Sequence, residues 1–229
     1  MAGVLLTVIN PNTTATMTAA LGEAAQAVAS AGTRVRAVNP ATGPAAIESH
    51  VDAAAAVPGV LTEISRASDS DGYVLACFGD PGLDACREVA RGPVVGIAEA
   101  AMHTATLLGR TFAVVTTLER TVGRARELVG RYGFERACSE VRATGIGVLE
   151  LETEASARAR VTAECADVVA AGADVVVLGC AGMADFAAEV SRAVGVPVVD
   201  GVAAATIMVE GLVRQGLSTS RRSEYSHPR

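Results

Sequence analysis

Two cysteines occupy matching positions of an internal repeat. Residues 71–77 read DGYVLAC and residues 174–180 read DVVVLGC, so an Asp opens each apolar stretch and a Cys closes it six residues later. Each copy continues through small residues and a helical pattern to a Pro-Val-Val segment, at 93–95 and 197–199. A fainter match pairs VIN, which ends at residue 10, with VVT, which ends at residue 116. The offset stays at 103 to 106, which predicts two similar α/β lobes related by an approximate two-fold axis.

A pair of thiols facing each other can invert configuration at an acidic carbon. One sulfur, as thiolate, removes the proton, and the other, as thiol, returns one to the opposite face. We expect Cys77 and Cys180 to lie at strand ends just ahead of helices, where ligands bind in open α/β sheets. Unpaired helix N–H groups and the helix dipole should make each thiolate easier to form than that of a free cysteine, whose pKa is about 8.5.

A cysteine on a buried strand is more often a small apolar core residue than a catalytic group. We interpret Cys86, Cys138 and Cys165 in that way. Cys77 and Cys180 differ from these three because they occupy matching positions of the repeat, although a duplicated unit could also carry two structural cysteines. Five cysteines without a CxxC pair predict free thiols in a reducing, cytoplasmic compartment.

Polar and small residues follow the predicted strands and could bind a ligand. Residues 10–14 read NPNTT and residues 116–117 are both Thr, so amide and hydroxyl groups are available to a neutral planar ring. Gly79, Ala181 and Gly182 would let backbone N–H groups approach an enolate oxygen. Helix capping or turn geometry explains each of these residues equally well.

Other polar residues fit structural roles better. We predict that Asp80 caps the helix after Cys77 and that His103 is a hydrogen-bonded core residue. Arginines and glutamates alternate between residues 119 and 136, which predicts a solvated helix face rather than an anion site. The arginines concerned are Arg120, Arg124, Arg131 and Arg136.

The composition excludes several classes of function. All 19 basic residues are Arg, so neither a Schiff-base lysine nor a P-loop lysine is possible. A net charge of −6 argues against nucleic-acid binding, and no two of the three histidines have a metal-ligand spacing. No uncharged apolar run reaches the roughly 18 residues of a membrane span. The chain opens on an apolar segment with no basic export signal.

Short β-branched segments alternate with Ala-rich segments, which predicts parallel sheets with helices on both faces. The polar residues after 217 form a tail or a subunit contact. Strands are expected at 4–9, 34–38, 73–77, 93–97, 111–116, 141–144, 174–179 and 196–199. Helices are expected near 14–30, 52–67, 82–91, 98–108, 120–132, 154–171, 184–194 and 201–215.

Five motifs resemble those of the hydantoin racemase family, which belongs to the aspartate/glutamate racemase superfamily and includes allantoin racemases. The resemblance extends from Val4 to about Ser220, and the two Cys-bearing motifs are its most specific part. The motifs are NPNT at 10–13, CFGDPGL at 77–83, GIAEA at 96–100, GCAGM at 179–183 and VPVVDG at 196–201.

The resemblance implies a cofactor-free racemase of 5-monosubstituted hydantoins, with Cys77 and Cys180 as acid and base at C5. It implies two flavodoxin-like lobes, 1–98 plus 200–229 and 99–199, with the active site in the cleft between them. It also implies a homo-oligomer, a tetramer or a hexamer. The family's ring-binding positions correspond to Asn12, Ile47, Phe78, Gly79, Thr116, Thr117, Ala181 and Gly182.

Alternatives remain open. An allantoin-specific racemase would act on a polar 5-substituent. The turns after the cysteines differ from the Cys-Asn-Thr and Cys-Thr-His patterns of glutamate racemases, which counts against an amino-acid racemase. With both cysteines present, a one-cysteine decarboxylase is not indicated. A maleate isomerase would use one sulfur as a nucleophile, and a non-catalytic two-lobed binding protein would need neither thiol.

Overall fold

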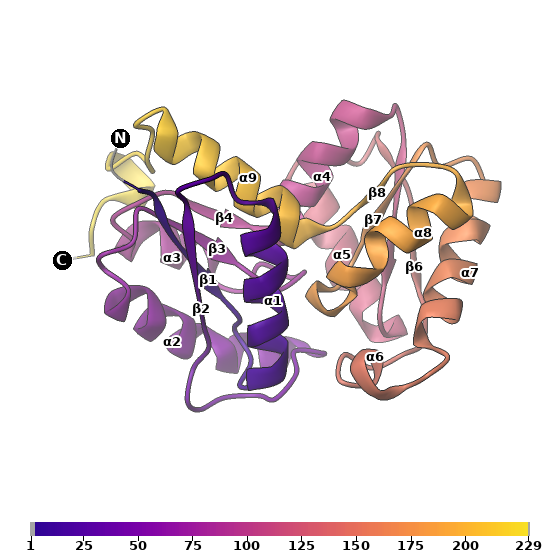
Figure 1. The fold of residues 1–229 in the computed structure, drawn as a ribbon, viewed down its shortest axis with the longest axis horizontal. Helices are drawn as coiled ribbons and strands as arrows, with labels where there is room; N and C mark the ends of the chain where they lie inside the picture. Colours follow the sequence, from indigo (N-terminus) through magenta and orange to yellow (C-terminus); the bar gives the residue numbers. More distant parts are fainter. Residues whose placement is uncertain (1–2, 229) are drawn as a thin grey trace.

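Two parallel four-stranded sheets form the framework of the protein in the computed structural model, which describes residues 3–228 (Figure 1). The first sheet has the order β2-β1-β3-β4 and the second the order β6-β5-β7-β8, which is the same order shifted by four. The strands are β1 (Leu5–Ile9), β2 (Arg34–Val38), β3 (Gly72–Leu75), β4 (Val94–Gly96), β5 (Phe112–Thr116), β6 (Cys138–Ala143), β7 (Val175–Leu178) and β8 (Val198–Val199).

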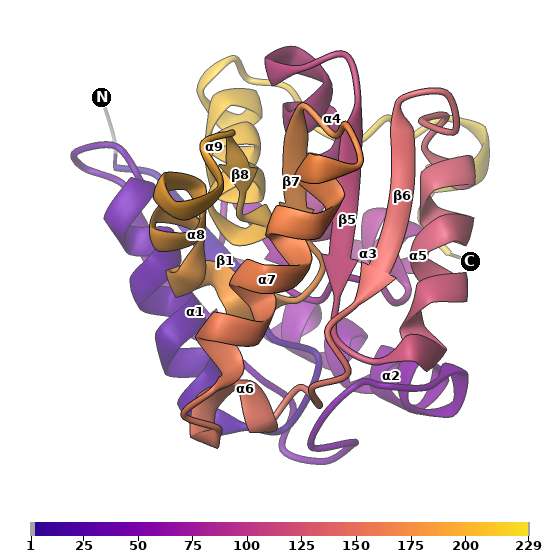
Figure 2. The ribbon, with the colours of Figure 1, turned by 90° about the vertical axis from the view of Figure 1, so that its right-hand side faces the viewer.

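Helices cover both sheets, so the predicted pair of flavodoxin-like α/β lobes is confirmed (Figure 2). The helices are α1 (Ala15–Val28), α2 (His50–Arg66), α3 (Leu83–Val89), α4 (Ile97–Leu108), α5 (Glu119–Arg131), α6 (Glu150–Thr153), α7 (Ala157–Ala170), α8 (Ala187–Val194) and α9 (Gly201–Arg214), with 3₁₀ segments η1 (Ala181–Phe186) and η2 (Ser223–Tyr225).

The central strands are buried along nearly their whole length because helices pack on both faces of each sheet. Val8 and Val74 in the first sheet and Val114 and Val177 in the second have no exposed surface. Corresponding strands end at corresponding places: β3 leads through Ala76 to one repeat cysteine, and β7 through Gly179 to the other. The repeat therefore brings both thiols to the carboxyl edges of the sheets.

Two expected helices differ from the structure. The helix expected over 154–171 begins three residues later, as α7, and the short helix α6 before it was not expected. The helix expected over 184–194 starts as the 3₁₀ turn η1, directly after Cys180. Cys86 and Cys165 are fully buried, as expected of core residues, whereas Cys138 is half-exposed on the edge strand β6.

The helices that follow β4 and β8 cross between the lobes. Helix α4 packs against β7 and α5 of the second lobe, whereas α9 packs against β3, β4 and α1 of the first (Figure 1). Their N-termini approach closely, since a Cβ on Gly201 would lie 2.6 Å from the carbonyl oxygen of Ile97. These contacts support the predicted division at residues 98 and 200, which stays a prediction. Residues 1, 2 and 229, which this prediction assigns to the first lobe, lie outside the residues that the structure describes.

Within residues 3–228, no helix combines the length and the apolar character needed to cross a lipid bilayer.

Candidate active site

Both repeat cysteines line one cavity between the lobes. The cavity is small, about 40 Å³, and takes residues from the carboxyl ends of β3, β5 and β7 and from three loops. Cys180 is buried and Cys77 is partly exposed. The lining residues are Asn12, Met17, Ile47, Ala76, Cys77, Phe78, Thr116, Thr117, Thr121, Val148, Gly179, Cys180 and Ala181.

Six of the eight expected ring-binding residues thus meet the two thiols, and two do not. Gly79 lies outside the cavity lining, and its N–H donates a hydrogen bond to the carbonyl oxygen of Cys77 at 2.8 Å. Gly182 lies behind Cys180, where an added Cβ would be 3.7 Å from the sulfur. Met17, Thr121 and Val148 also line the cavity, and no sequence signal distinguished them from packing residues.

The expectation of easily formed thiolates is wrong. Burial raises the pKa of Cys77 to about 12 and that of Cys180 to about 11. Neither sulfur has an α-helix N-terminus behind it: a turn separates Cys77 from α3, and Cys180 is followed by the 3₁₀ segment η1. Without an aligned helix dipole, loss of solvation dominates the pKa of both thiols.

The two thiols have different neighbours. Arg124 lowers the pKa of Cys77 and so opposes burial. The N–H of Gly182 lowers the pKa of Cys180, while the charge of Glu48 raises it. The expected solvated helix face is therefore wrong for Arg124, whose Nη2 donates to the carbonyl oxygen of Gly79 at 2.9 Å.

Two polar side chains in the cavity have hydrogen-bond donors that are available to a ligand. The Oδ1 of Asn12 accepts from Asn10 Nδ2 at 2.8 Å and from the Thr14 N–H at 2.9 Å, which fixes the amide. Its Nδ2 faces only the weak acceptor Met17 Sδ, at 3.3 Å. The Thr117 hydroxyl makes no hydrogen bond with the residues that the structure describes. Thr116 is already engaged, donating to the Gly179 carbonyl at 3.2 Å.

A hydrogen bond between the lobes lies beside the cavity. Ile47 comes from the first lobe and Val148 from the second. Glu48 joins them, because its Oε1 accepts the Val148 N–H at 2.7 Å. Ligand pockets typically measure about 300–1,000 Å³, so this cleft must widen to admit a substituted ring.

Asp80 does not cap the helix after Cys77. Its carboxylate accepts from the N–H groups of Ala98 at 3.2 Å and Glu99 at 3.0 Å, and so caps α4 instead. The Tyr132 hydroxyl donates to the same carboxylate at 2.6 Å. Burial raises the pKa of Asp80 to about 6, against the effect of these hydrogen bonds. Its backbone has φ 40°, a left-handed conformation that places the side chain toward α4.

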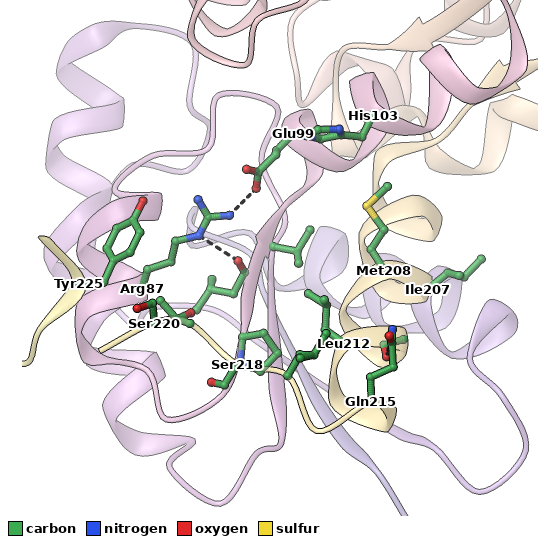
Figure 3. Close-up of a pocket in the computed structure, with 16 residues that line it drawn as sticks. Arg87, Glu99, His103, Ile207, Met208, Leu212, Gln215, Ser218, Ser220 and Tyr225 are labelled. Atoms are coloured by element: carbon green, nitrogen blue, oxygen red, sulfur yellow. Dashed lines mark hydrogen bonds and ion pairs between the residues drawn. The ribbon is translucent and has the colours of Figure 1, made fainter. Parts of the chain in front are cut away.

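A larger cavity, about 620 Å³, lies between α4, α9 and the C-terminal tail (Figure 3). Neither repeat cysteine lines it, and Arg87 is engaged by Glu99 at 2.5 Å. His103 points into this cavity and is exposed, so its predicted place in the core is wrong. The side chain packs edge-on against Phe134, with ring centroids 4.8 Å apart. The small cavity holds the reactive groups, and we take it as the candidate active site.

Among the described residues, no three His, Cys, Asp or Glu side chains lie close enough together to hold a metal ion.

The two-lobed fold agrees with the comparisons. The family model for Asp/Glu/hydantoin racemases matches residues 6–209. The hydantoin racemase of Rhizobium meliloti is 47% identical over 96% of this chain and 93% of its own length. The allantoin racemase from Klebsiella pneumoniae superposes with a TM-score of 0.97 at 48% identity, covering 99% of this chain and 94% of that one. Allantoin racemase from Pseudomonas fluorescens gives 0.94 at 38%, covering 99% and 97%.

The chain belongs to the Asp/Glu/hydantoin racemase family. It is accordingly an isomerase, a racemase that acts on a small molecule.

Proposed function

We propose that the protein racemises 5-monosubstituted hydantoins without a cofactor, using Cys77 and Cys180 as base and acid at C5. The observation that carries the proposal is that both thiols, from corresponding strands of the two lobes, line a single cavity. The relatives named hydantoin racemase support the substrate class.

The reaction needs one thiolate and one thiol. The thiolate takes the C5 proton, and the electron pair left behind delocalises into the neighbouring carbonyl as an enolate. The other thiol then protonates C5 from the opposite face and becomes the thiolate, so the two sulfurs exchange states in each turnover. Burial raises the pKa of both thiols, which makes each thiolate a stronger base toward a carbon acid but keeps its population small.

The available donors suit a neutral ring. Asn12 Nδ2 and the Thr117 hydroxyl would bond ring carbonyls, and the developing enolate oxygen would strengthen such a bond. No arginine lines the cavity, so a free amino-acid carboxylate would have no cation to pair with. This composition favours a hydantoin over an amino acid.

The second candidate is an allantoin-specific racemase, which the similarity to allantoin racemase structures favours. The two candidates differ in the polarity of the 5-substituent that the protein must accommodate. A cavity of about 450 Å³ shares Met17 and Ala181 with the thiol cavity and is lined by Leu21, Leu151 and Phe186, with Arg158 and Asp185 also present. Its apolar wall suits apolar 5-substituents, so we expect 5-benzyl- and 5-isopropylhydantoin to be racemised faster than allantoin.

Polarimetry on one pure enantiomer in deuterium oxide tests the proposal. We expect optical rotation to decay to zero, deuterium to enter C5 of the product, and a chelator to have no effect. Binding without loss of rotation would indicate a non-catalytic protein. A covalent adduct seen by mass spectrometry would favour nucleophilic chemistry of the maleate isomerase kind.

We further propose a cytoplasmic homo-oligomer, a tetramer or a hexamer. Leu107, Ile207 and Leu217, from α4, α9 and the segment after α9, expose half or more of their surface (82%, 55% and 51%). Subunit contact would bury these side chains, and a contiguous apolar patch is typical of such a contact. Light scattering on the purified chain would give the mass, and a monomer at micromolar concentration would contradict the assembly.

A further inference from the structure

Helix α5 of the second lobe holds the loop that carries Cys77 in the first lobe. We call residues 77–84, the loop after β3 together with the first two residues of α3, the Cys77 loop. Arg124 donates to the Gly79 carbonyl at 2.9 Å, the Tyr132 hydroxyl donates to Asp80 at 2.6 Å, and Arg131 pairs with Asp84. Three residues of α5 and its C-cap therefore bind three residues of this loop.

The contact of Arg124 differs from the other two because its partner, the Gly79 carbonyl, carries no charge. No carboxylate lies within ion-pair distance of its guanidinium among the residues that the structure describes, whereas Arg131 has Asp84. The guanidinium lies flat against Gly79: a Cβ there would be 2.9 Å from Arg124 Cζ. Gly79 has no positive φ, so what its missing Cβ provides is space for the guanidinium in this position and not backbone freedom. The sequence thus leaves room for a cation two residues from Cys77.

The other half of the repeat has no such cation. The offset of 103 to 106 places the counterpart of Arg124 at residues 18–21 (TAAL) of α1. Glu23 is the one charged residue in that helix. Cys180 instead has the N–H of Gly182 and the negative charge of Glu48 nearby.

We propose that Arg124 is a positioning residue that acts across the lobes: it holds the Gly79 carbonyl and supplies the positive charge that stabilises the Cys77 thiolate, while Cys180 has no equivalent. Of the charged and titratable groups around Cys77, Arg124 lowers its pKa, and Cys180 and Asp80 raise it. The importance of this effect for catalysis rests on the proposed function, whereas the effect on the thiol does not.

Alkylation by iodoacetamide, followed at each cysteine by peptide mass spectrometry between pH 7 and 10, tests the proposal without any substrate. Arg124→Gln can keep a donor for the Gly79 carbonyl but removes the charge, and Arg124→Lys keeps the charge. Tyr132→Phe is the matched control, since it loosens the same loop without changing a charge. Thermal melting of each variant checks that the fold is retained, and a second neutral variant, Arg124→Met, replaces Arg124→Gln if that variant is unstable.

We expect Arg124→Gln to slow alkylation of Cys77 about tenfold at pH 8, the equivalent of one pKa unit, and to leave Cys180 unchanged. Arg124→Lys should recover most of the rate, and Tyr132→Phe should keep the pH profile of Cys77. An unchanged Cys77 profile in Arg124→Gln, or equal slowing at both cysteines, would overturn the inference. If the wild type racemises hydantoins and the Cys77 profile does not move, this inference alone fails. If the profile moves but no hydantoin is racemised, the proposed function alone fails.

Discussion

The two cysteine-bearing loops are held in different ways, although the strands before them correspond. The Cys77 loop is held by the other lobe, through Arg124, Tyr132 and the N-terminus of α4. The η1 segment after Cys180 is held within its own lobe by Arg158, which pairs with Asp185 and stacks on Phe186 at 4.3 Å. Duplication thus explains the paired thiols. Among the described residues, hydrogen bonds and an ion pair link the Cys77 loop to the other lobe, whereas η1 meets the other lobe by packing against α1 and α9.

Helices α4 and α9, which follow β4 and β8, also differ in how their N-termini are capped. Helix α9 begins at its own N-cap Asp200, whose carboxylate accepts from Val202 at 3.0 Å and Ala203 at 2.9 Å. The corresponding N-cap of α4 is Gly96, and a Cβ there would lie 2.4 Å from the carboxylate of Asp80. Asp80 therefore fills the space of a local cap, and in doing so it links the α4 N-terminus to the Cys77 loop.

The largest expected effect tests whether the thiols are equivalent in catalysis. Cys77→Ser and Cys180→Ser should each lower kcat for racemisation by about 10³-fold, because a serine hydroxyl is too weak an acid to replace either proton-transfer group. Polarimetry measures the loss, and circular dichroism checks the fold. Each mutant should retain slow C5 deuterium exchange on a different enantiomer. Full activity in either mutant would exclude the two-thiol mechanism.

The pH dependence comes next in size. Both thiols have a raised pKa, about 12 and about 11, so the thiolate fraction is small at neutral pH and grows about tenfold per pH unit. We expect kcat/KM to rise steeply between pH 6 and 8, because the reaction needs one thiolate and the second thiol stays protonated in that range. Initial rates in buffers of constant ionic strength measure this. A plateau below pH 7 would contradict the raised pKa values, because kcat/KM reports the ionisation of the free enzyme.

We expect the smallest effects on activity and stability from replacing the two helix caps, Asp80 and Asp200. Asp80→Ala leaves two N–H groups and the Tyr132 hydroxyl without their acceptor, so unfolding free energy should fall by about 1–3 kcal/mol and kcat should fall with it. Asp200→Ala removes a local cap, and it should cost about 0.5–2 kcal/mol with kcat within about twofold of wild type. Urea unfolding and steady-state kinetics on both variants give the comparison. Equal effects on kcat would contradict a link between Asp80 and the Cys77 loop.

Features that the parallel sheet itself imposes could be predicted from the sequence. Residues at the carboxyl ends of neighbouring strands must meet at one edge of their sheet, which groups Asn12 with Cys77 and Thr117 with Cys180. The two-fold relation expected from the repeat then places the two groups in one cleft. The repeat also predicted that the two lobes would be similar, and both sheets have the same strand order.

Contacts between the lobes could not be predicted in this way. Helical periodicity shows that Arg124 lies on a polar face, but not that this face meets Gly79. Asp80 follows a cysteine and precedes a helix, so a local cap was the simpler interpretation, and only its left-handed backbone turns it toward α4. The raised pKa of each thiol depends on burial, which local sequence does not encode.

The size of the thiol cavity has a kinetic consequence. A space of about 40 Å³ between residues of both lobes cannot exchange substrate for product while it stays shut. We therefore expect each cycle to include a separation of the lobes, which would break the hydrogen bond from Val148 to Glu48. We expect solvent viscosity to slow turnover of a fast substrate, since release of the mirror image then competes with its conversion back inside the closed cleft.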